Sequence, residues 1–259
     1  MTGESVRGFY DQLAESYHLL YRDWSAAIVR QGDVLYGLIQ QEIGDGSATI
    51  LDAACGIGTQ SLGLAAHGHR VVAVDLSPVA ATRAAGEAAV RGLALPTAAA
   101  DMRALPFRAD SFDAVVCADN ALPHLLTPAD LRAALGEMRR ILRPGGLLMA
   151  TTRDYDALLE THPQSTAPQA TTTSHGRAIS FQLWNWHNDG EHYDLELFQL
   201  TSHHDVWSTH IGRATYWALT RQQLTDFART AGFERPVWHF PEQTGFFQPA
   251  LTARNPMSP

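Results

Sequence analysis

The sequence predicts an α/β fold: a doubly wound, mostly parallel sheet with N-terminal helices and an inserted antiparallel hairpin region. Between residues 49 and 152, short apolar runs alternate with helical patterns, and this alternation builds a parallel sheet with helices on both faces. Later in the chain, two strongly alternating segments flank Asn188-Asp189-Gly190, which is a typical hairpin turn. In doubly wound sheets, ligands bind beyond the carboxyl ends of the strands.

The elements of the central region follow from their apolar periodicity and from the residues at their ends. Two helices begin with proline after a capping residue, Ser77 or Thr127, and they are Pro78–Arg91 and Pro128–Leu142. The turn Arg143-Pro144-Gly145-Gly146 ends the second helix and leads into a strand. The predicted strands are Thr49–Ala53, Arg70–Val74, Thr97–Ala100, Phe112–Ala118 and Gly146–Thr151.

The flanking segments complete the expected organisation. The first 45 residues have the periodicity of two helices, and Gln164–Ser174 is rich in Thr, Ser, Pro and Ala, as loops are. Later strands are expected at Ala178–Trp186, His192–Leu200 and Ser208–Leu219, followed by a helix at Thr220–Ala231 and one or two final strands. We therefore expect one compact unit with four parts: an N-terminal helical cap (1–45), a cofactor-binding core (46–155), an antiparallel substrate region (156–217) and a C-terminal part of the core sheet (218–259).

Composition excludes several classes of partner. Of the 259 residues, 45% are hydrophobic and 18% are charged, which supplies a full core. The net charge is −8 and no run of Lys or Arg is present, so neither nucleic acid nor a membrane is expected as a partner. The chain has two cysteines, no long apolar span and no signal-peptide pattern, which favours a cytoplasmic protein. A homodimer is compatible with the sequence.

A glycine-containing turn follows the first predicted strand. Gly56 and Gly58 let the backbone approach a ligand closely, beside Ala54 and the free N–H groups of the next helix. Nicotinamide enzymes use a similar turn, so the glycines alone are weak evidence. However, Asp52 ends the strand four residues before Gly56, and Ser61 occupies the third glycine position of the nicotinamide pattern. A carboxylate there suits the amino end of a sulfonium cofactor better than a pyrophosphate.

Carboxylates end the next three strands as well. Asp75, followed by Leu76, lies 19 residues after Gly56, near the spacing of about 20 at which an acidic residue accepts hydrogen bonds from ribose hydroxyls. Asp101 can accept from an adenine amino group, with Met102 packed on the ring. Asp119 ends the fourth strand, where the transferring group would lie. Four carboxylates in register beyond a glycine turn therefore predict a nucleoside-containing cofactor.

Residues 45–155 resemble the class I S-adenosylmethionine-dependent methyltransferases, which have a Rossmann-like fold. The segment from Asp52 to Gly58, Asp75, Asp101 and the turn at 143–146 match that pattern, with Thr59 in place of its third glycine. The flanks are similar to the glycine, sarcosine and dimethylglycine N-methyltransferases. Residues 119–125 are similar to their Gly-Asn-Ser-x-x-His-Leu element, residues 153–159 to Arg-Asn-Tyr-Asp-x-Ile-Leu, and residues 213–216 to Arg-x-x-Tyr.

This resemblance implies S-adenosylmethionine (SAM) as cofactor and a small-molecule acceptor, most simply an amine nitrogen of an amino-acid-like substrate. It implies that Tyr17, Trp24 and Arg30 cap the cofactor and bind its carboxylate. Arg213 would hold a substrate carboxylate. The expected substrate residues are Asn120, His124, Asp154, Tyr155, Arg213 and Tyr216, with His124 and Asn120 as the catalytic pair. The resemblance implies a substrate of the glycine or sarcosine type, but Asp154 replaces an asparagine of that group. This replacement argues against glycine itself and leaves a larger amine or a natural-product acceptor open.

The residues by themselves leave alternatives open. Arg213 fits a structural ion pair equally well, and His124 can either take a proton or be a packed histidine. The aromatic residues Trp184, Trp186, Tyr193 and Trp207 suit core packing more than a cation site. The histidines lack metal-ligand spacing, so no metal is expected; they are His187, His192, His203, His204 and His210. Alternative functions are an O- or C-methyltransferase of natural-product biosynthesis, a nicotinamide oxidoreductase and a non-catalytic cofactor sensor.

Overall fold

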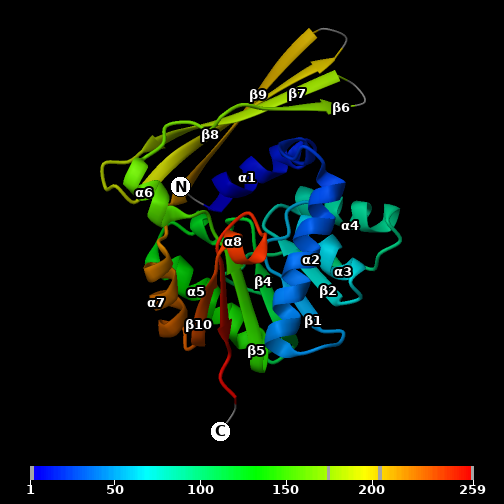
Figure 1. Cartoon of the computed structure of the whole chain (residues 1–259), viewed down its shortest axis with the longest axis vertical. Helices are drawn as coiled ribbons and strands as arrows, with labels where there is room; N and C mark the ends of the chain where they lie inside the picture. Colours follow the sequence, from blue (N-terminus) through cyan, green and yellow to red (C-terminus); the bar gives the residue numbers. More distant parts are fainter. Residues whose placement is uncertain (1–2, 174–175, 204–205, 258–259) are drawn as a thin grey trace.

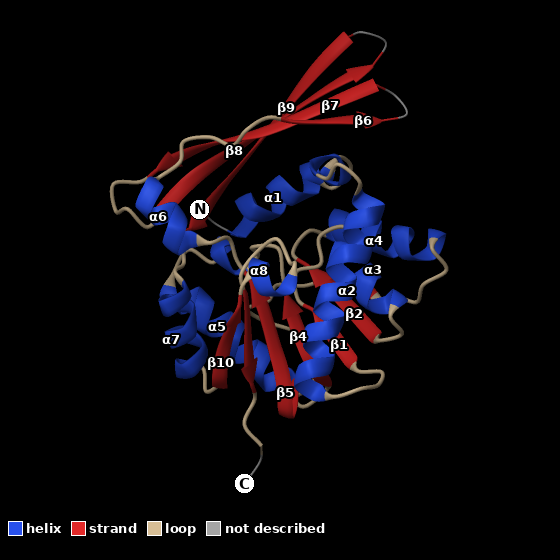
Figure 2. Cartoon of the chain, in the orientation of Figure 1, coloured by secondary structure: helices blue, strands red, loops and turns tan. Residues whose placement is uncertain are grey.

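A computed structural model describes residues 3–173, 176–203 and 206–257 of the chain. It contains a seven-stranded sheet in the order β10-β11-β5-β4-β1-β2-β3 and a four-stranded sheet in the order β6-β7-β8-β9 (Figure 2). Strands β1 to β5 of the larger sheet are parallel, and β11 runs antiparallel to both β5 and β10. The predicted fold class is therefore confirmed.

The core strands lie close to their predicted positions. They are β1 (Thr49–Asp52), β2 (Arg70–Asp75), β3 (Thr97–Ala99), β4 (Phe112–Cys117), β5 (Leu142–Thr151), β10 (Glu234–His239) and β11 (Ala250–Arg254). Only β5 differs clearly, because it begins at Leu142 rather than at Gly146. Phe112 pairs with Leu142 and Ala114 pairs with Leu147, so the glycine turn forms an irregularity inside the strand.

Helices cover both faces of the seven-stranded sheet. The described helices are α1 (Gly3–Leu13), η1 (Tyr17–Leu20), α2 (Trp24–Ile43), α3 (Thr59–Ala66), α4 (Pro78–Val90), η2 (Leu122–His124), α5 (Pro128–Ile141), α6 (Tyr155–Thr161), α7 (Arg221–Thr230) and α8 (Pro241–Thr244). Residues of α5 and α7 share one apolar cluster with the strands, and residues of α2, α3 and α4 share another. The predicted caps Ser77, Thr127 and Thr220 each accept a backbone N–H bond at their helix start. None of the described helices has both the length and the apolar character to cross a bilayer.

The four-stranded sheet is fully antiparallel and one strand larger than expected. Its strands are β6 (Gln169–Thr173), β7 (Gly176–Trp186), β8 (His192–His203) and β9 (Val206–Trp217). The predicted loop over Gln164–Ser174 is wrong for residues 169–173, which pair with β7; Ser174 lies outside the described residues. Threonine has high strand propensity, and β7 offers these residues a partner that their composition alone does not reveal.

Helix α1 fills the space between the two sheets. Figure 1 shows the four-stranded sheet across one end of the core with α1 beneath it, and α1 contacts both β9 and α4. Phe9 and Leu13 of α1 join a buried cluster with Tyr193 and Leu195 of β8. The N-terminal segment thus lies over the carboxyl ends of the core strands, where ligands of doubly wound sheets bind.

Helices α2 and α3 touch at two glycines, and this contact leads to a stability prediction. A Cβ atom on Gly63 would lie 2.6 Å from both Gly32 Cα and the Ile28 carbonyl oxygen. We expect Gly63→Ala to lower the free energy of unfolding by about 2 kcal/mol, because overpacking forces the backbone to shift. Urea unfolding measures this change. The control is Gly86→Ala, where a Cβ meets nothing within 4 Å and alanine should stabilise its helix. Equal stabilisation by both variants would contradict the contact.

Candidate functional site

Two cavities meet beyond the carboxyl ends of the core strands. The first has a volume of about 180 Å³ and is lined by residues that follow β1, β2, β3 and β4. The second has a volume of about 780 Å³ and lies between the core, the N-terminal segment and the four-stranded sheet. Four described residues line both cavities, and they are Tyr10, Tyr17, Tyr21 and Asp119. The junction of the two cavities is therefore built by three tyrosines around one carboxylate.

The two glycines of the first turn have different tasks. Both have left-handed backbone, with φ of 51° at Gly56 and 92° at Gly58, a conformation that favours glycine. A Cβ on Gly56 would meet no heavy atom within 4 Å, whereas one on Gly58 would lie 3.1 Å from the Ala84 Cβ. Gly56 and Ala54 line the first cavity, but Gly58 does not. Gly56 thus leaves room for a ligand, and Gly58 permits close packing against α4.

Asp52 lies beneath this turn rather than on a cavity wall. Its carboxylate accepts a hydrogen bond of 2.5 Å from Ser61 Oγ and one of 3.4 Å from the Ala54 N–H. Burial raises its pKa to about 6, although these hydrogen bonds act in the other direction. In this arrangement Asp52 holds the turn in shape; direct contact with a cofactor stays a prediction.

Asp75 is at the wall of the first cavity, beside Leu76. Its two oxygens accept bonds of 2.8 Å from the backbone N–H groups of Gly56 and Ser77. Burial raises its pKa. A carboxylate oxygen accepts more than one hydrogen bond, so Asp75 both fixes the glycine turn and can accept from a pair of ligand hydroxyls.

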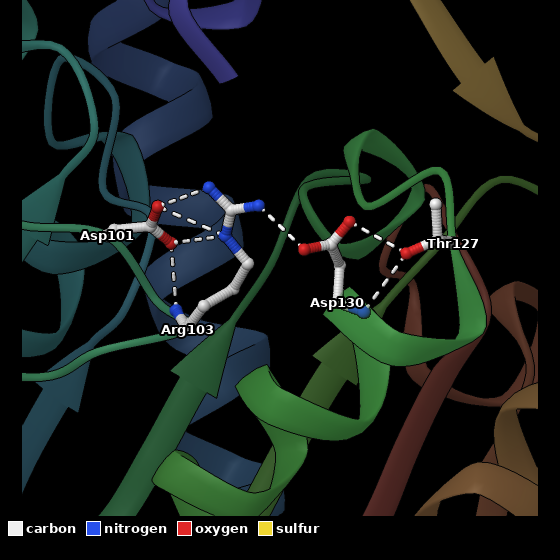
Figure 3. Close-up of polar contacts among 4 residues, drawn as sticks. All are labelled: Asp101, Arg103, Thr127 and Asp130. Carbon is white, nitrogen blue, oxygen red and sulfur yellow. Dashed lines mark hydrogen bonds and ion pairs between the residues drawn. The ribbon is translucent and has the colours of Figure 1, made fainter. Parts of the chain in front are cut away.

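An ion-pair network closes the other side of the first cavity (Figure 3). Arg103 donates to both oxygens of Asp101, with Nη2 2.6 Å from Oδ2, and its Nη1 lies 2.7 Å from Asp130 Oδ1. Burial alone would raise the pKa of Asp101, but the hydrogen bonds from Arg103 hold that pKa below its usual range. Met102 also lines this cavity. An adenine amino group would therefore share Asp101 with Arg103, a residue that the sequence analysis did not select.

The three predicted N-terminal residues have separate positions. Tyr17 lines both cavities. Trp24 donates from Nε1 to Thr59 Oγ1 at 2.8 Å. This hydrogen bond links the start of α2 to the first residue of α3. Arg30 is exposed and borders the second cavity, not the first. Of this set, only Tyr17 reaches the junction.

Asp119 and Asn120 follow β4 with left-handed backbone, at φ of 55° and 67°. Asp119 accepts hydrogen bonds from the hydroxyls of Tyr17 and Tyr21 at 3.3 and 3.2 Å, and from Gln248 Nε2 at 3.4 Å. Burial raises the pKa of Asp119, while Arg153 and these three donors oppose that shift. Tyr21 and Gln248 were absent from the sequence-based site, because no local pattern links them to β4.

His124 is neutral in this environment. Its Nε2 lies 2.7 Å from the Tyr10 hydroxyl, and its ring centroid is 4.2 Å from that of Tyr216. Burial, followed by the charge of Arg153, lowers its pKa to about 3. A base with so low a pKa takes up a proton from an amine poorly. The geometry therefore favours the packed-histidine alternative, with Tyr10 as its partner.

Arg153 is a residue of the second cavity that was not among the predicted site residues. Its guanidinium lies 4.8 Å from the Trp184 ring centroid and 5.4 Å from that of Tyr216. It donates to Tyr193 Oη at 2.8 Å and to Gln182 Oε1 at 3.2 Å. Among the residues that the structure describes, no carboxylate is within ion-pair distance of it. Arg153 lines the second cavity, so this cation faces the space where an acceptor can bind.

Asn120 adds a donor next to Arg153. Its Oδ1 accepts a bond of 3.0 Å from the Arg153 backbone N–H. Its Nδ2 is buried near the Tyr155 hydroxyl but makes no hydrogen bond of good geometry with any described residue. A buried amide N–H without an acceptor is costly, and Asn120 borders the second cavity. Together the two residues present donors of the kind that an oxygen-rich, negatively charged group accepts from.

The remaining four predicted substrate residues occupy four different positions. Arg213 is on the outer face of β9, with its side chain 66% exposed and its Nε 2.7 Å from Glu196 Oε1, so the structure brings it to neither cavity. Asp154 caps α6 and pairs with Arg221 at the rim of the second cavity. Tyr155 is buried with its hydroxyl 3.0 Å from that of Tyr193, and Tyr216 lines the second cavity.

The histidine and aromatic sets contribute no separate site. In the described part of the chain, no group of three His, Cys, Asp or Glu side chains is placed to hold a metal; His204 lies outside that part. Trp184, Trp186 and Tyr193 pack in the cluster beneath the four-stranded sheet, whereas Trp207 is exposed. The cation over Trp184 is the protein's own Arg153.

The core of the chain, which carries the strand-end carboxylates, matches a known domain family. Residues 50–146 match the methyltransferase domain family, and the sheet order and cavities fit that match. Residues 50–146 are therefore assigned to a methyltransferase domain, and this match argues against the nicotinamide oxidoreductase alternative.

Several known proteins are similar to this chain. It is 37% identical over 139 residues to the glycine/sarcosine N-methyltransferase of Parasynechococcus marenigrum, covering 53% of this chain and 48% of the relative. It is 33% identical over 160 residues to the enzyme of that name from Halorhodospira halochloris, covering 61% and 57%. The chain thus spans about half the length of the curated relatives it matches. The structure of SAM-bound CalS10, an amino pentose methyltransferase from Micromonospora echinaspora, superimposes with a TM-score of 0.73 at 19% identity over 93% of this chain and 95% of CalS10.

SAM fits the first cavity by the chemistry of its walls. The open space at Gly56 admits a ligand against the backbone, Asp75 can accept from ribose hydroxyls, and Asp101 with Met102 can bind adenine. Leu76 and Ala54 supply apolar wall between these polar groups. With adenine and ribose in these positions, the cationic end of the cofactor would lie toward the tyrosines and Asp119 of the junction.

Proposed function

We propose that this protein is an N-methyltransferase whose acceptor carries both an amine and a carboxylate, as an amino acid does. The observation that supports this most directly is Arg153, a guanidinium at the second cavity with no carboxylate partner among the described residues. Arginine matches carboxylates in shape and charge. The unsatisfied Nδ2 of Asn120 adds a second donor on the same side.

The opposite charge lies at the cavity junction. Asp119 is close enough to Arg153 for the two charges to interact, and it alone among the described carboxylates lines both cavities. An acceptor with its carboxylate on Arg153 can therefore extend its amine toward Asp119. This orientation brings the amine nitrogen to the boundary with the first cavity, which is where a methyl group must be received.

The second cavity favours an acceptor larger than glycine. Its volume of about 780 Å³ is within the range of 300–1,000 Å³ that holds drug-sized ligands. Several walls are apolar, and they come from Phe9, Leu13, Leu158, Phe181, Leu195 and Leu197. We infer that the acceptor carries a bulky, partly apolar body next to its amine and carboxylate.

The main task of the protein in this reaction is to position the acceptor amine against the methyl group. Bound SAM supplies a methyl group that is already activated by the adjacent sulfonium. Arg153 and Asn120 would fix the carboxylate, and the apolar walls would exclude water, so that the amine lone pair is held in line for reaction. Tyr10, Tyr17 and Tyr21 close the junction from the N-terminal side.

A panel of acceptors with methyl-labelled SAM tests this proposal. The panel contains glycine, sarcosine, bulky amino acids, their amine analogues without a carboxylate, and hydroxy acids. We expect N-methylated product from bulky amino acids at least about tenfold faster, by kcat/KM, than from glycine, because apolar contact adds binding energy. Transfer only to hydroxy acids or to carbon would favour the O- or C-methyltransferase alternative. SAM binding with transfer to no acceptor would favour a sensor. Cytoplasmic location and a homodimer stay predictions.

A further inference from the structure

We propose that Asp119 binds the ammonium group of the acceptor and removes its proton before methyl transfer. This inference rests on the proposed function, because it needs an amine acceptor. The first observation is the position of the Asp119 carboxylate. It lies at the only junction between the two cavities that the described residues form. Asp119 lies two residues after β4, the central strand between β1 and β5, and its backbone N–H donates to Thr151 Oγ1 at 2.8 Å, so its backbone is held in place.

The groups that face Asp119 suit a cation with exchangeable protons. The hydroxyls of Tyr17 and Tyr21 and the Gln248 amide donate to the carboxylate from η1, from the loop after it and from the C-terminal segment. Tyr10 and Tyr216 contribute further ring faces and hydroxyls nearby. An ammonium group among tyrosine rings and a carboxylate gains both cation–π and charge-assisted hydrogen bonds. Arg153 is the nearby positive charge, and in the proposed complex it binds the carboxylate of the acceptor.

The proton step balances within the site. One N–H bond of the ammonium breaks, its electron pair stays on nitrogen, and the proton forms an O–H bond with Asp119. The products are a neutral amine with a free lone pair and a neutral carboxylic acid. Burial favours this uncharged pair over the ion pair, in line with the raised pKa of Asp119. His124 does not compete for the proton, since its pKa is lowered to about 3. After product release, Asp119 returns the proton to water.

The backbone at this position allows a clean test. Asp119 has φ of 55°, a conformation that asparagine and glycine adopt with little strain. Asp119→Asn keeps the shape and one acceptor oxygen, whereas Asp119→Gly removes the side chain. Both variants should therefore fold, and circular dichroism with S-adenosylhomocysteine calorimetry checks that they do.

The experiment is a pH profile of kcat/KM from pH 6.5 to 9.5, with the fastest amine acceptor and the full chain. In the wild type, Asp119 generates the free amine, so the profile should be nearly flat. In Asp119→Asn and Asp119→Gly, only the amine already deprotonated in solution can react. Their kcat/KM should be about 10²-fold lower at pH 7, rise about tenfold per pH unit below the amine pKa, and approach wild type at high pH. Glu196→Gln on the outer face of β8 is the control carboxylate and should keep the flat profile.

The outcomes separate the two proposals. If the wild type methylates an amine and both Asp119 variants keep its flat profile, or fall by the same factor at every pH, Asp119 does not take the proton. If no amine is methylated by the wild type at any pH, the proposed function itself fails. A steep profile in both variants beside a flat wild type supports the proton transfer.

Discussion

Replacing Arg153 with glutamine is expected to lower kcat/KM by about 10³-fold for an acceptor that carries a carboxylate. Arg153 forms no ion pair with any described residue and borders the second cavity. Two charge-assisted hydrogen bonds contribute about 1.5–3 kcal/mol each, and their loss corresponds to this factor. Arg153→Lys should lose less, about tenfold to 10²-fold, because it keeps the charge but loses the planar fork. The measurement is steady-state kinetics on matched acceptors with and without the carboxylate.

Two controls make this result specific. The analogue without a carboxylate should lose little between wild type and Arg153→Gln, and S-adenosylhomocysteine affinity should stay constant. Arg213→Gln should change kcat/KM less than about twofold, since that side chain is 66% exposed and paired with Glu196. If instead Arg213→Gln abolishes activity and Arg153→Gln does not, the carboxylate site inferred from the Arg-x-x-Tyr resemblance is right and the one built on Arg153 is wrong.

Asp75→Ala is expected to weaken S-adenosylhomocysteine binding by about 10³-fold. The carboxylate can accept from two ribose hydroxyls, and it already holds the Gly56 N–H at 2.8 Å, so the variant loses ligand contacts and turn rigidity together. Isothermal titration calorimetry measures the dissociation constant. Asp226→Ala, an exposed carboxylate on α7, should leave it unchanged.

A smaller loss of S-adenosylhomocysteine affinity would change the assignment of Asp75. If Asp75→Ala binds S-adenosylhomocysteine within about threefold of wild type, Asp75 holds the turn only, and ribose recognition belongs to another group. Unfolding of the variant is checked separately by circular dichroism, because the Ser77 N–H that starts α4 also loses its acceptor.

The sequence reveals the parts of this molecule that depend on local patterns. Asp75, Asp101 and Asp119 could be placed together because each ends a predicted parallel strand, and adjacent parallel strands bring their carboxyl ends to one edge. The capping residues were likewise read from short-range chemistry. Strand β6 was missed, because threonine-rich residues 169–173 become a strand only by pairing with β7.

The sequence alone did not show which of two arginines, Arg153 or Arg213, faces the second cavity. Both are arginines in short elements similar to known N-methyltransferases, and nothing local says which one faces the cavity. Glu196 is directly opposite Arg213 in the β8–β9 register, which a single sequence does not reveal. A signal for Arg153 did exist. It follows the end of β5, whose neighbour β4 ends near Asn120, so adjacency in the predicted sheet brings the two residues together.

The position of β11 has a consequence for how the protein is made. This strand follows every other described strand, yet it lies inside the core sheet between β10 and β5. As the nascent chain leaves the ribosome, β5 therefore waits with an unpaired, apolar edge until residues 250–254 emerge. Unpaired edges of this kind promote aggregation, and such distant pairing forms slowly. Yield in a living host should accordingly depend on chaperone supply and on the speed of translation between the codons for β5 and those for β11.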